Sequence, residues 1–308
     1  MRIVKDTKID FMSKTTYAWF LSGVLLLLGL ISLIANRGPK LSIDFKGGTL
    51  VAVNFTKPVD INKIRSGLEN LSIEGQNFDF SNEEIKHFGD ETNIAIRIAS
   101  LENEPTKFAN KVSERLAEIY PDFLPENRNE FILSLEKVGP KIGAELSGDA
   151  LFAIFSALGL ILIYISIRFE LKYALGAITA LTHDVLITLG IFSILGYEIS
   201  LAVIAAFLTI VGYSLNDTIV IFDRVRENVK GLKGSSIRSV VNQSINESLG
   251  RTIITSLTTF LVVLILFLVG GEVINTFSFA MIVGVIIGTY SSIFVASPVV
   301  IKMDKSDK

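Results

Sequence analysis

The sequence contains no cysteine and only two histidines, His87 and His183, among 308 residues. The absence of cysteine excludes disulfide bonds, thiolate metal ligands and thiol nucleophiles. Because the two histidines lie far apart in the sequence, the chain also lacks a short histidine-based metal motif. The net charge of −2 gives no reason to expect nucleic acid as a partner. We therefore expect neither a metal nor a cofactor.

Charged residues are also scarce. They make up 19% of the chain, against about a quarter in a soluble domain, while 50% of the residues are hydrophobic. The apolar residues gather in runs of about 18 to 25 residues, the length that crosses a bilayer core of about 30 Å. This pattern predicts a polytopic membrane protein with six transmembrane helices at 17–35, 150–167, 173–195, 199–222, 253–269 and 277–301.

The first apolar run needs comparison with a signal peptide, because basic residues from Arg2 to Lys14 precede it. A cleaved signal carries a shorter apolar region and a small-x-small cleavage site. The run at 17–35 is longer, and no clear cleavage site precedes Asn36. We expect a retained transmembrane helix, with a cleaved signal as the alternative.

Basic residues mark alternate connections between the runs. Lys and Arg follow the second, fourth and sixth runs, whereas the connections at 196–198 and 270–275 contain neither. Because short cytoplasmic connections carry an excess of Lys and Arg, we expect both termini, 1–16 and 302–308, in the cytoplasm. The long polar stretch 36–149 then lies outside.

A second polar stretch, 223–252, separates the fourth and fifth runs. It is strongly charged at first, and from Ser236 to Arg251 its apolar residues recur at helical offsets. This pattern is typical of an amphipathic helix on the membrane surface, here the cytoplasmic one. A solvated linker is the alternative.

The outside stretch has the pattern of an α+β domain. Alternating apolar residues predict strands at 49–55 and 93–99, and a third at 130–140, with a possible strand near 76–80. Helical periodicity predicts helices at 59–71 and 106–120. The order βαββαβ is typical of a ferredoxin-like sandwich. We find no nucleophile, base and third group together on it, so a binding or lever domain is favoured over an enzyme.

Glycine-containing motifs flank this domain. "LSIDFKGGTL" holds Asp44, Phe45, Gly47 and Gly48 just before the first strand, and "KVGPKIGAEL" holds Gly139 and Pro140 just before the second run. Glycine permits a sharp turn or a close backbone approach. Both motifs are expected to form turns or hinges at the domain boundary.

Two apolar runs contain polar pairs: His183 with Asp184, and Asn216 with Asp217. A charge at mid-membrane costs about 2.5–3.5 kcal/mol on insertion scales, so such residues face protein or water and have partners. Because desolvation disfavours the charged form, a carboxylate there is a candidate proton carrier. Arg251, just before the fifth run, is the candidate cation beside Asp217.

Structural interpretations remain open for both pairs. Asp217 could form a permanent ion pair with Arg251, or lie at the lipid headgroups if its helix ends early. His183 and Asp184 could hold helices together by hydrogen bonds without moving protons. In the last run, Gly284 and Gly288 have the GxxxG spacing that lets another helix approach closely.

Six motifs occur in order along nearly the whole chain: "IDFKGGTL", "VGP", "RFE", "HDV", "VGYSLNDTIVIFDRVREN" and "RTIITS". Together they resemble the SecF proteins, subunits of the accessory SecDF complex of bacterial protein export within the RND superfamily. The resemblance implies six transmembrane helices and one small extracytoplasmic domain in the bacterial cytoplasmic membrane.

The same resemblance implies partners and a role. SecF proteins pair with SecD and associate with the SecYEG channel, where the proton-motive force drives late preprotein translocation after the SecA ATPase has acted. The motifs place the family's proton-passage residues at Asp217 and Arg251. Two other functions remain as alternatives: half of an RND-like transporter of lipid or small solutes, and a scaffold that moves no protons.

Overall fold

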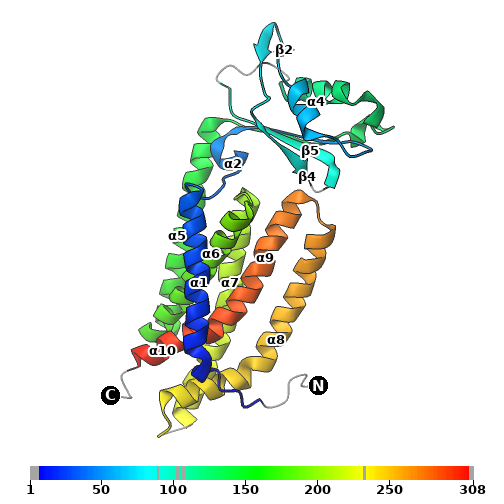
Figure 1. Ribbon diagram of the computed structural model, residues 1–308. Helices are drawn as coiled ribbons and strands as arrows, with labels where there is room; N and C mark the ends of the chain where they lie inside the picture. Colours follow the sequence, from blue (N-terminus) through cyan, green and yellow to red (C-terminus); the bar gives the residue numbers. More distant parts are fainter. Residues whose placement is uncertain (1–6, 89, 102–104, 106–107, 232–233, 305–308) are drawn as a thin grey trace. The chain divides into compact units, whose positions relative to one another are not determined.

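The computed structural model describes the chain except residues 1–6, 89, 102–104, 106–107, 232–233 and 305–308 (Figure 1). The chain forms two compact units, Met1–Lys40 with Leu151–Lys308, and Leu41–Ala150. We call them the helical unit and the α+β unit, and each is described by itself.

Six helical segments in the described part of the chain are long and apolar enough to cross a membrane, which confirms the predicted number. A helix satisfies its own backbone hydrogen bonds, as a segment in hydrocarbon must. The elements are η1 (Met12–Lys14), α1 (Thr15–Ala35), α5 (Pro140–Arg168), α6 (Leu171–Leu195), α7 (Leu201–Gly231), α8 (Ile237–Val269), α9 (Glu272–Ser291), the π-helical η4 (Ser292–Ala296) and α10 (Ser297–Met303).

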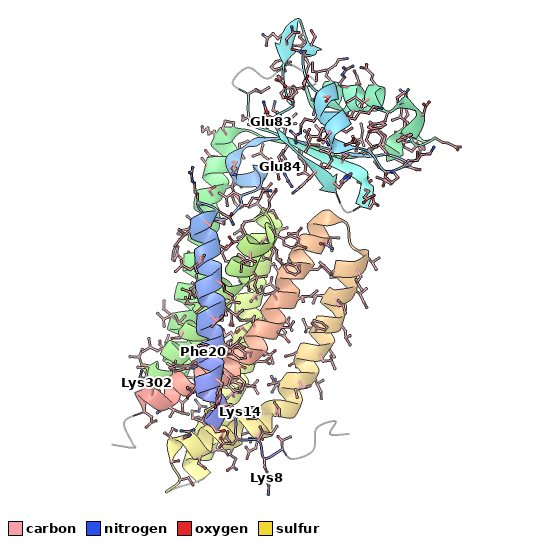
Figure 2. All side chains as sticks on the ribbon, viewed as in Figure 1. Lys8, Lys14, Phe20, Glu83, Glu84 and Lys302 are labelled. Atoms are coloured by element: carbon pink, nitrogen blue, oxygen red, sulfur yellow. The ribbon has the colours of Figure 1, made fainter. Side chains whose placement is uncertain are left out.

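Helices α6, α7 and α9 pack together, with α1 against α6 and α8 against α7 and α9 (Figure 1). Small residues allow the closest approaches. A Cβ atom on Gly29 would lie 2.8 Å from the Cα atom of Gly190, so α1 and α6 meet backbone to backbone. The outer helices expose large apolar side chains, among them Phe20 (75% exposed; Figure 2) and Ile167 (82%), as a lipid-facing surface would.

Three helices extend well beyond the predicted apolar spans. Helix α5 begins at Pro140 instead of 150, α7 continues to Gly231 instead of 222, and α8 begins at Ile237 instead of 253. The stretch 223–252 is therefore not a separate element. Its first residues belong to α7, and from Ile237 onward it forms the start of α8, where the predicted apolar face is buried. Buried Val225, Ile237 and Ile245 pack into one core of the helical unit, so packing continues where the hydropathy signal stops.

The α+β unit has a four-stranded antiparallel sheet in the order β4-β5-β1-β6. This is the strand order of a ferredoxin-like sandwich, and it confirms the predicted fold. Helices α3 (Ile61–Gly67) and α4 (Phe108–Ile119) bury Ile64 and Leu116 against Val51 and Ile96 of the sheet. The remaining elements are α2 (Ile43–Lys46), β1 (Gly48–Asn54), β2 (Leu71–Ile73), β3 (Gln76–Phe78), β4 (Glu84–Phe88), β5 (Asp90–Ile98), η2 (Pro121–Phe123), η3 (Arg128–Glu130) and β6 (Ile132–Val138).

One predicted strand has a different place. The segment near 76–80 contributes β3, which pairs with β2 in a separate two-stranded hairpin. The second strand of the sheet is β4, which the sequence pattern missed. Among the side chains of β4 that the structure describes, Ile85 is the buried one, and its neighbours such as Glu84 and Lys86 are polar, so an edge strand of this kind gives little periodic signal.

Candidate proton-transfer site

Asp217 lies inside α7 and is 2% exposed. Two hydroxyls of α8 donate to its carboxylate: Thr255 Oγ1 at 3.5 Å from Oδ1, and Ser256 Oγ at 3.3 Å from Oδ2. Ser256 also lies 2.7 Å from Thr289 Oγ1 of α9. The carboxylate is therefore held at the junction of three helices by two long hydrogen bonds.

Both hydroxyls have another partner within reach. Thr255 Oγ1 lies 3.1 Å from the carbonyl oxygen of Arg251 and 3.0 Å from that of Thr252, and Ser256 has Thr289. Each hydroxyl can therefore break its hydrogen bond to Asp217 and still donate to another acceptor. An unbonded buried polar group would cost about 1–3 kcal/mol, so the alternative partners make rearrangement of these helices inexpensive.

Arg251 is exposed, one turn before Thr255 on α8. Among the interactions of the described residues, no ion pair within 4 Å joins it to Asp217, so the permanent ion pair is not present in this conformation. Helix α7 continues for several turns beyond Asp217, so the carboxylate does not lie at an early helix end. Asn216 is exposed on another face of α7, so its side chain does not point toward the junction of α7, α8 and α9 as that of Asp217 does.

A second polar cluster surrounds Asp184 on α6, which is completely buried. Its Oδ2 accepts from Ser214 of α7 at 2.6 Å and from Ser291 of α9 at 2.8 Å. Its Oδ1 lies 2.9 Å from His183 Nδ1. Asp184 is thus bonded more tightly than Asp217, and it joins α6 to α7 and α9.

His183 extends this cluster to α1. Its Nε2 lies 2.9 Å from Ser22 Oγ, and that hydroxyl lies 2.9 Å from the Tyr290 hydroxyl of α9. Tyr290 donates to the carbonyl oxygen of Ala18 at 2.5 Å. The sequence analysis missed Ser22, Ser214 and Tyr290, although a serine three residues before Asp217 places both on one face of a helix.

Gly284 and Gly288 of α9 face α7. A Cβ atom on Gly284 would lie 2.2 Å from Ile210 Cγ1, and one on Gly288 would lie 3.0 Å from the Cβ atom of Ser214. The GxxxG face therefore lets α9 approach α7 at the residue that donates to Asp184.

The two glycine motifs of the α+β unit meet in a packed corner. Gly47 and Gly48 have φ angles of 73° and 134°, and a Cβ atom on Gly47 would lie 2.9 Å from the Cα atom of Pro140. Phe45 is buried, and Asp44 lies in the short α2. A Cβ atom on Gly139 would contact nothing within 4 Å, so the corner requires Gly47 and Gly48 but not Gly139.

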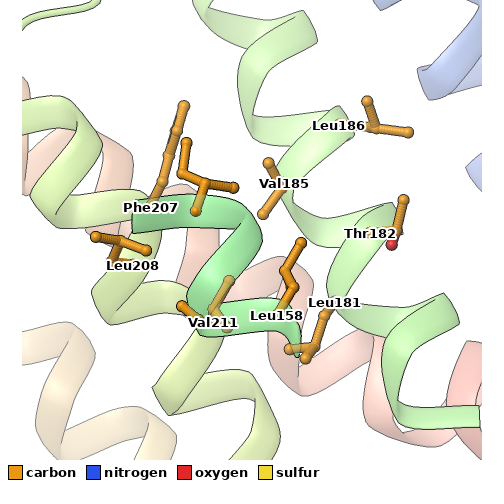
Figure 3. A pocket seen from close by; sticks show the side chains of 10 residues that line it. Leu158, Leu181, Thr182, Val185, Leu186, Phe207, Leu208 and Val211 are labelled. Atoms are coloured by element: carbon orange, nitrogen blue, oxygen red, sulfur yellow. The ribbon is translucent and has the colours of Figure 1, made fainter. Parts of the chain in front are cut away.

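A cavity of about 100 Å³ lies between α5, α6 and α7 (Figure 3). Leu158, Val185 and Phe207 line it with other apolar residues, and Thr182 is the polar residue of the lining. Typical small-molecule sites are about 300–1,000 Å³ with several polar groups. The described residues also include no group of three or more His, Asp or Glu side chains able to hold a metal ion.

Comparisons with known proteins agree with this architecture. The family described as "Protein export membrane protein SecD/SecF, C-terminal" matches residues 124–306, and "SecD/SecF GG Motif" matches residues 32–59. The "Protein translocase subunit SecF" of Calditerrivibrio nitroreducens is 45% identical over 97% of this chain and 95% of its own length. The protein of the same name from Rhodothermus marinus is 46% identical over 98% of this chain and 96% of its own length.

Solved structures give the same relationship. SecDF from Thermus thermophilus has a TM-score of 0.81 and 36% identity, and covers 96% of this chain. SecDF in a super-membrane-facing form has a TM-score of 0.67 and 35% identity, over 97% of this chain. This chain spans 39% of each SecDF chain. It is a multi-pass membrane protein, and it belongs to the SecF family of protein translocase subunits.

Proposed function

We propose that the chain acts in bacterial protein export as the SecF half of a SecD–SecF pair and couples the proton-motive force to late preprotein translocation. The pair would work beside the SecYEG channel, after SecA has acted, without enzymatic chemistry of its own. The names of the curated relatives support the export role, and the two SecDF structures support SecD as the partner.

The proposed orientation places both termini in the cytoplasm and the region 36–149 outside the cytoplasmic membrane. Figure 2 supports it, since Lys8, Lys14 and Lys302 lie at one end of the helical unit. Lys and Arg are enriched in cytoplasmic segments.

The observation that carries the proton-coupling proposal is the buried Asp217 with two long, replaceable hydrogen bonds. When ionised, Asp217 accepts from Ser256 and Thr255 of α8. When protonated, it becomes a donor itself, and one of these hydroxyls turns to its other acceptor. Loss of contact between α7 and α8 then lets α8 shift, and Arg251 on that helix moves relative to the carboxylate.

The available energy is sufficient for such a step. One charge that crosses a potential of 100 mV yields about 2.3 kcal/mol, which biases a two-state equilibrium by roughly fiftyfold. We propose that this bias reaches the outside domain through α1 and α5, whose chain connections run into that domain at the glycine motifs.

The test is export into inverted membrane vesicles that contain this chain with its SecD partner. We expect Asp217→Asn to lose the stimulation by a proton gradient and to keep gradient-independent export. Asp223→Asn is the matched control, since Asp223 lies on the same helix but is partly exposed and pairs with Arg168 and Arg226. Normal stimulation in Asp217→Asn would leave only the scaffold role. The small apolar cavity gives no support to the transport of a solute.

A further inference from the structure

The hydrogen bonds around His183 fix the number of protons that the His183–Asp184 pair holds. Four groups form a hydrogen-bond chain from α6 through α1 to α9 and back to α1, buried at Asp184, His183 and Ser22 and partly buried at Tyr290. The groups are Asp184 Oδ1, the His183 ring, the Ser22 hydroxyl and the Tyr290 hydroxyl, which donates to the carbonyl of Ala18. Its first three links are 2.9 Å long, and the link to Ala18 is 2.5 Å.

The direction of the chain follows from its last link. A carbonyl oxygen only accepts, so Tyr290 spends its one hydroxyl proton on Ala18. The Tyr290 oxygen must then accept a hydrogen bond from Ser22, and this bond uses the single hydroxyl proton of Ser22. Ser22 Oγ can therefore only accept from His183, and Nε2 must carry a proton.

The other end of the chain needs a second proton. Asp184 Oδ2 already accepts from Ser214 and Ser291. The contact between Nδ1 and Oδ1 requires one proton between them, on the ring or on the carboxyl group. The pair thus holds one proton more than a neutral imidazole beside a carboxylate, and its net charge is zero.

This neutrality suits the surroundings. The elements packed on the pair contribute Ser22 from α1, Ser214 from α7, and Tyr290 and Ser291 from α9. Tyr290 is the titratable group among them, and the nearest acid along α7 is Asp217, one turn beyond Ser214. No lysine or arginine contacts the pair within the part of the chain that the structure describes. A net charge there would be desolvated without compensation.

We propose that His183 and Asp184 form a second protonation site that holds one transferable proton. The presence or absence of this proton determines which group donates in the hydrogen bonds from His183 to Ser22 and from Ser22 to Tyr290. When the Nε2 proton leaves to water, Nε2 becomes an acceptor. The Ser22 hydroxyl turns to donate to Nε2, and the Tyr290 hydroxyl turns to donate to Ser22. Ser22 and Tyr290 keep their own hydroxyl protons, so no other covalent bond to hydrogen breaks. The hydrogen bond from Tyr290 to the Ala18 carbonyl is lost.

The step concerns α1 directly, since Ala18 and Ser22 both lie on it. Loss of the proton releases Tyr290 from Ala18 and so loosens α1 from α9. A part for this site in export rests on the proposed proton-coupling function of the chain. The protonation state of His183, however, can be measured without export.

The experiment is nitrogen-15 NMR of the full chain in lipid bilayers. A His87→Gln variant leaves His183 as the one histidine of the chain, so its ring signals are unambiguous. We expect the Nε2 signal to show a protonated form and an unprotonated form whose proportions change with pH. The carbonyl signal of Ala18 should change over the same pH range.

Two tyrosine variants sharpen the test. Tyr290→Phe frees Ser22 to donate to Nε2. At a pH where both forms are observed, we expect the ratio of unprotonated to protonated Nε2 to rise about fivefold relative to the native chain, the effect of one hydrogen bond worth about 1 kcal/mol. Tyr213→Phe is the control, because the buried Tyr213 hydroxyl has no hydrogen-bond partner among the described residues, and it should change nothing.

Nε2 that stays unprotonated, or stays protonated, over the whole pH range would overturn the proposal, as would an Ala18 signal that does not follow the titration. If the Tyr290→Phe protein does not fold, the pH titration of His183 in the protein with native Tyr290 is by itself the test of the proposal. Normal titration of His183 combined with normal export in Asp217→Asn would remove the proposed function and leave this site standing.

Discussion

Ser214 and Asp217 lie one turn apart on the buried face of α7, and they belong to two different acid clusters. Ser214 donates to Asp184 of α6, whereas Asp217 accepts from Ser256 of α8. One helical turn of α7 therefore connects a tightly bonded carboxyl group with a loosely bonded one. A rotation of α7 that changes one cluster must change the other.

Ser256→Ala tests the loose cluster. The change removes a donor to Asp217 and the contact with Thr289, so we expect gradient-stimulated export to fall several-fold and the stability of the helical unit to fall by about 1 kcal/mol. Thr258→Val on the same helix is the control, since among the described residues Thr258 donates only to carbonyls of its own helix. Equal export in the two variants would contradict a role for Ser256.

Gly48→Ala tests the corner of the α+β unit. The added Cβ atom would lie 2.5 Å from the carbonyl oxygen of Ile98, at a φ of 134°. We expect destabilisation of this unit by about 1–3 kcal/mol, measured by hydrogen exchange of the β1 and β5 amides in the full chain. Gly139→Ala should leave the exchange unchanged, because its Cβ atom meets open space.

Asp90 gives the α+β unit a contribution to stability that depends on pH. The hydrogen bond from the Thr92 hydroxyl, aided by backbone N–H donors, holds the pKa of Asp90 below its usual value. A depressed pKa in the folded state means that the stabilisation is present above the unfolded-state pKa and is lost as the pH falls through the folded-state pKa.

Thr92→Val should therefore destabilise the unit at neutral pH and lose part of this difference in acid, as measured by denaturant unfolding at several pH values. Thr56→Val is the control. Its hydroxyl donates to the carbonyl of Phe123, so its effect should not depend on pH. A Thr92→Val effect that is the same at every pH would contradict the assignment.

Asn242 of α8 holds the segment before α1. Its side chain accepts from the backbone N–H groups of Phe11 and Met12 and donates to the carbonyl of Ile9. We expect Asn242→Ala to raise hydrogen exchange at Phe11 and Met12 at least tenfold, since about 1.4 kcal/mol corresponds to a factor of ten. Gln243→Ala should not, because in the part of the chain that the structure describes the Gln243 side chain bonds only to Glu247.

Hydropathy and periodicity were sufficient for the six spans and for three of the four strands of the sheet, β1, β5 and β6, because long apolar runs and alternating strands are local patterns. The ends of α5, α7 and α8 were not predictable in the same way, since helices continue under tertiary packing after the apolar signal stops. In the edge strand β4, Ile85 is the buried one of the described side chains, so the strand has almost no alternating pattern.

In the candidate site, too, the residues with a local sequence signal were predicted, and the contacts set by tertiary packing were not. Asp217, His183 and Asp184 stand out because a charge in an apolar run is conspicuous. Ser22 lies 161 residues from His183, and a serine in an apolar helix has no local sign of its partner. Arg251 was placed just before the fifth span, whereas it lies within α8, and the sequence could not show that it would lack an ion pair with Asp217 in this conformation.

The most direct test of the proton-coupling role is infrared difference spectroscopy of the Asp217 carboxyl group, in the complex with SecD in sealed vesicles. We predict a protonated-carboxyl band that appears and disappears when the proton gradient is applied and collapsed, and that is absent in Asp217→Asn. A carboxyl group that stays ionised under both conditions would contradict proton exchange at Asp217.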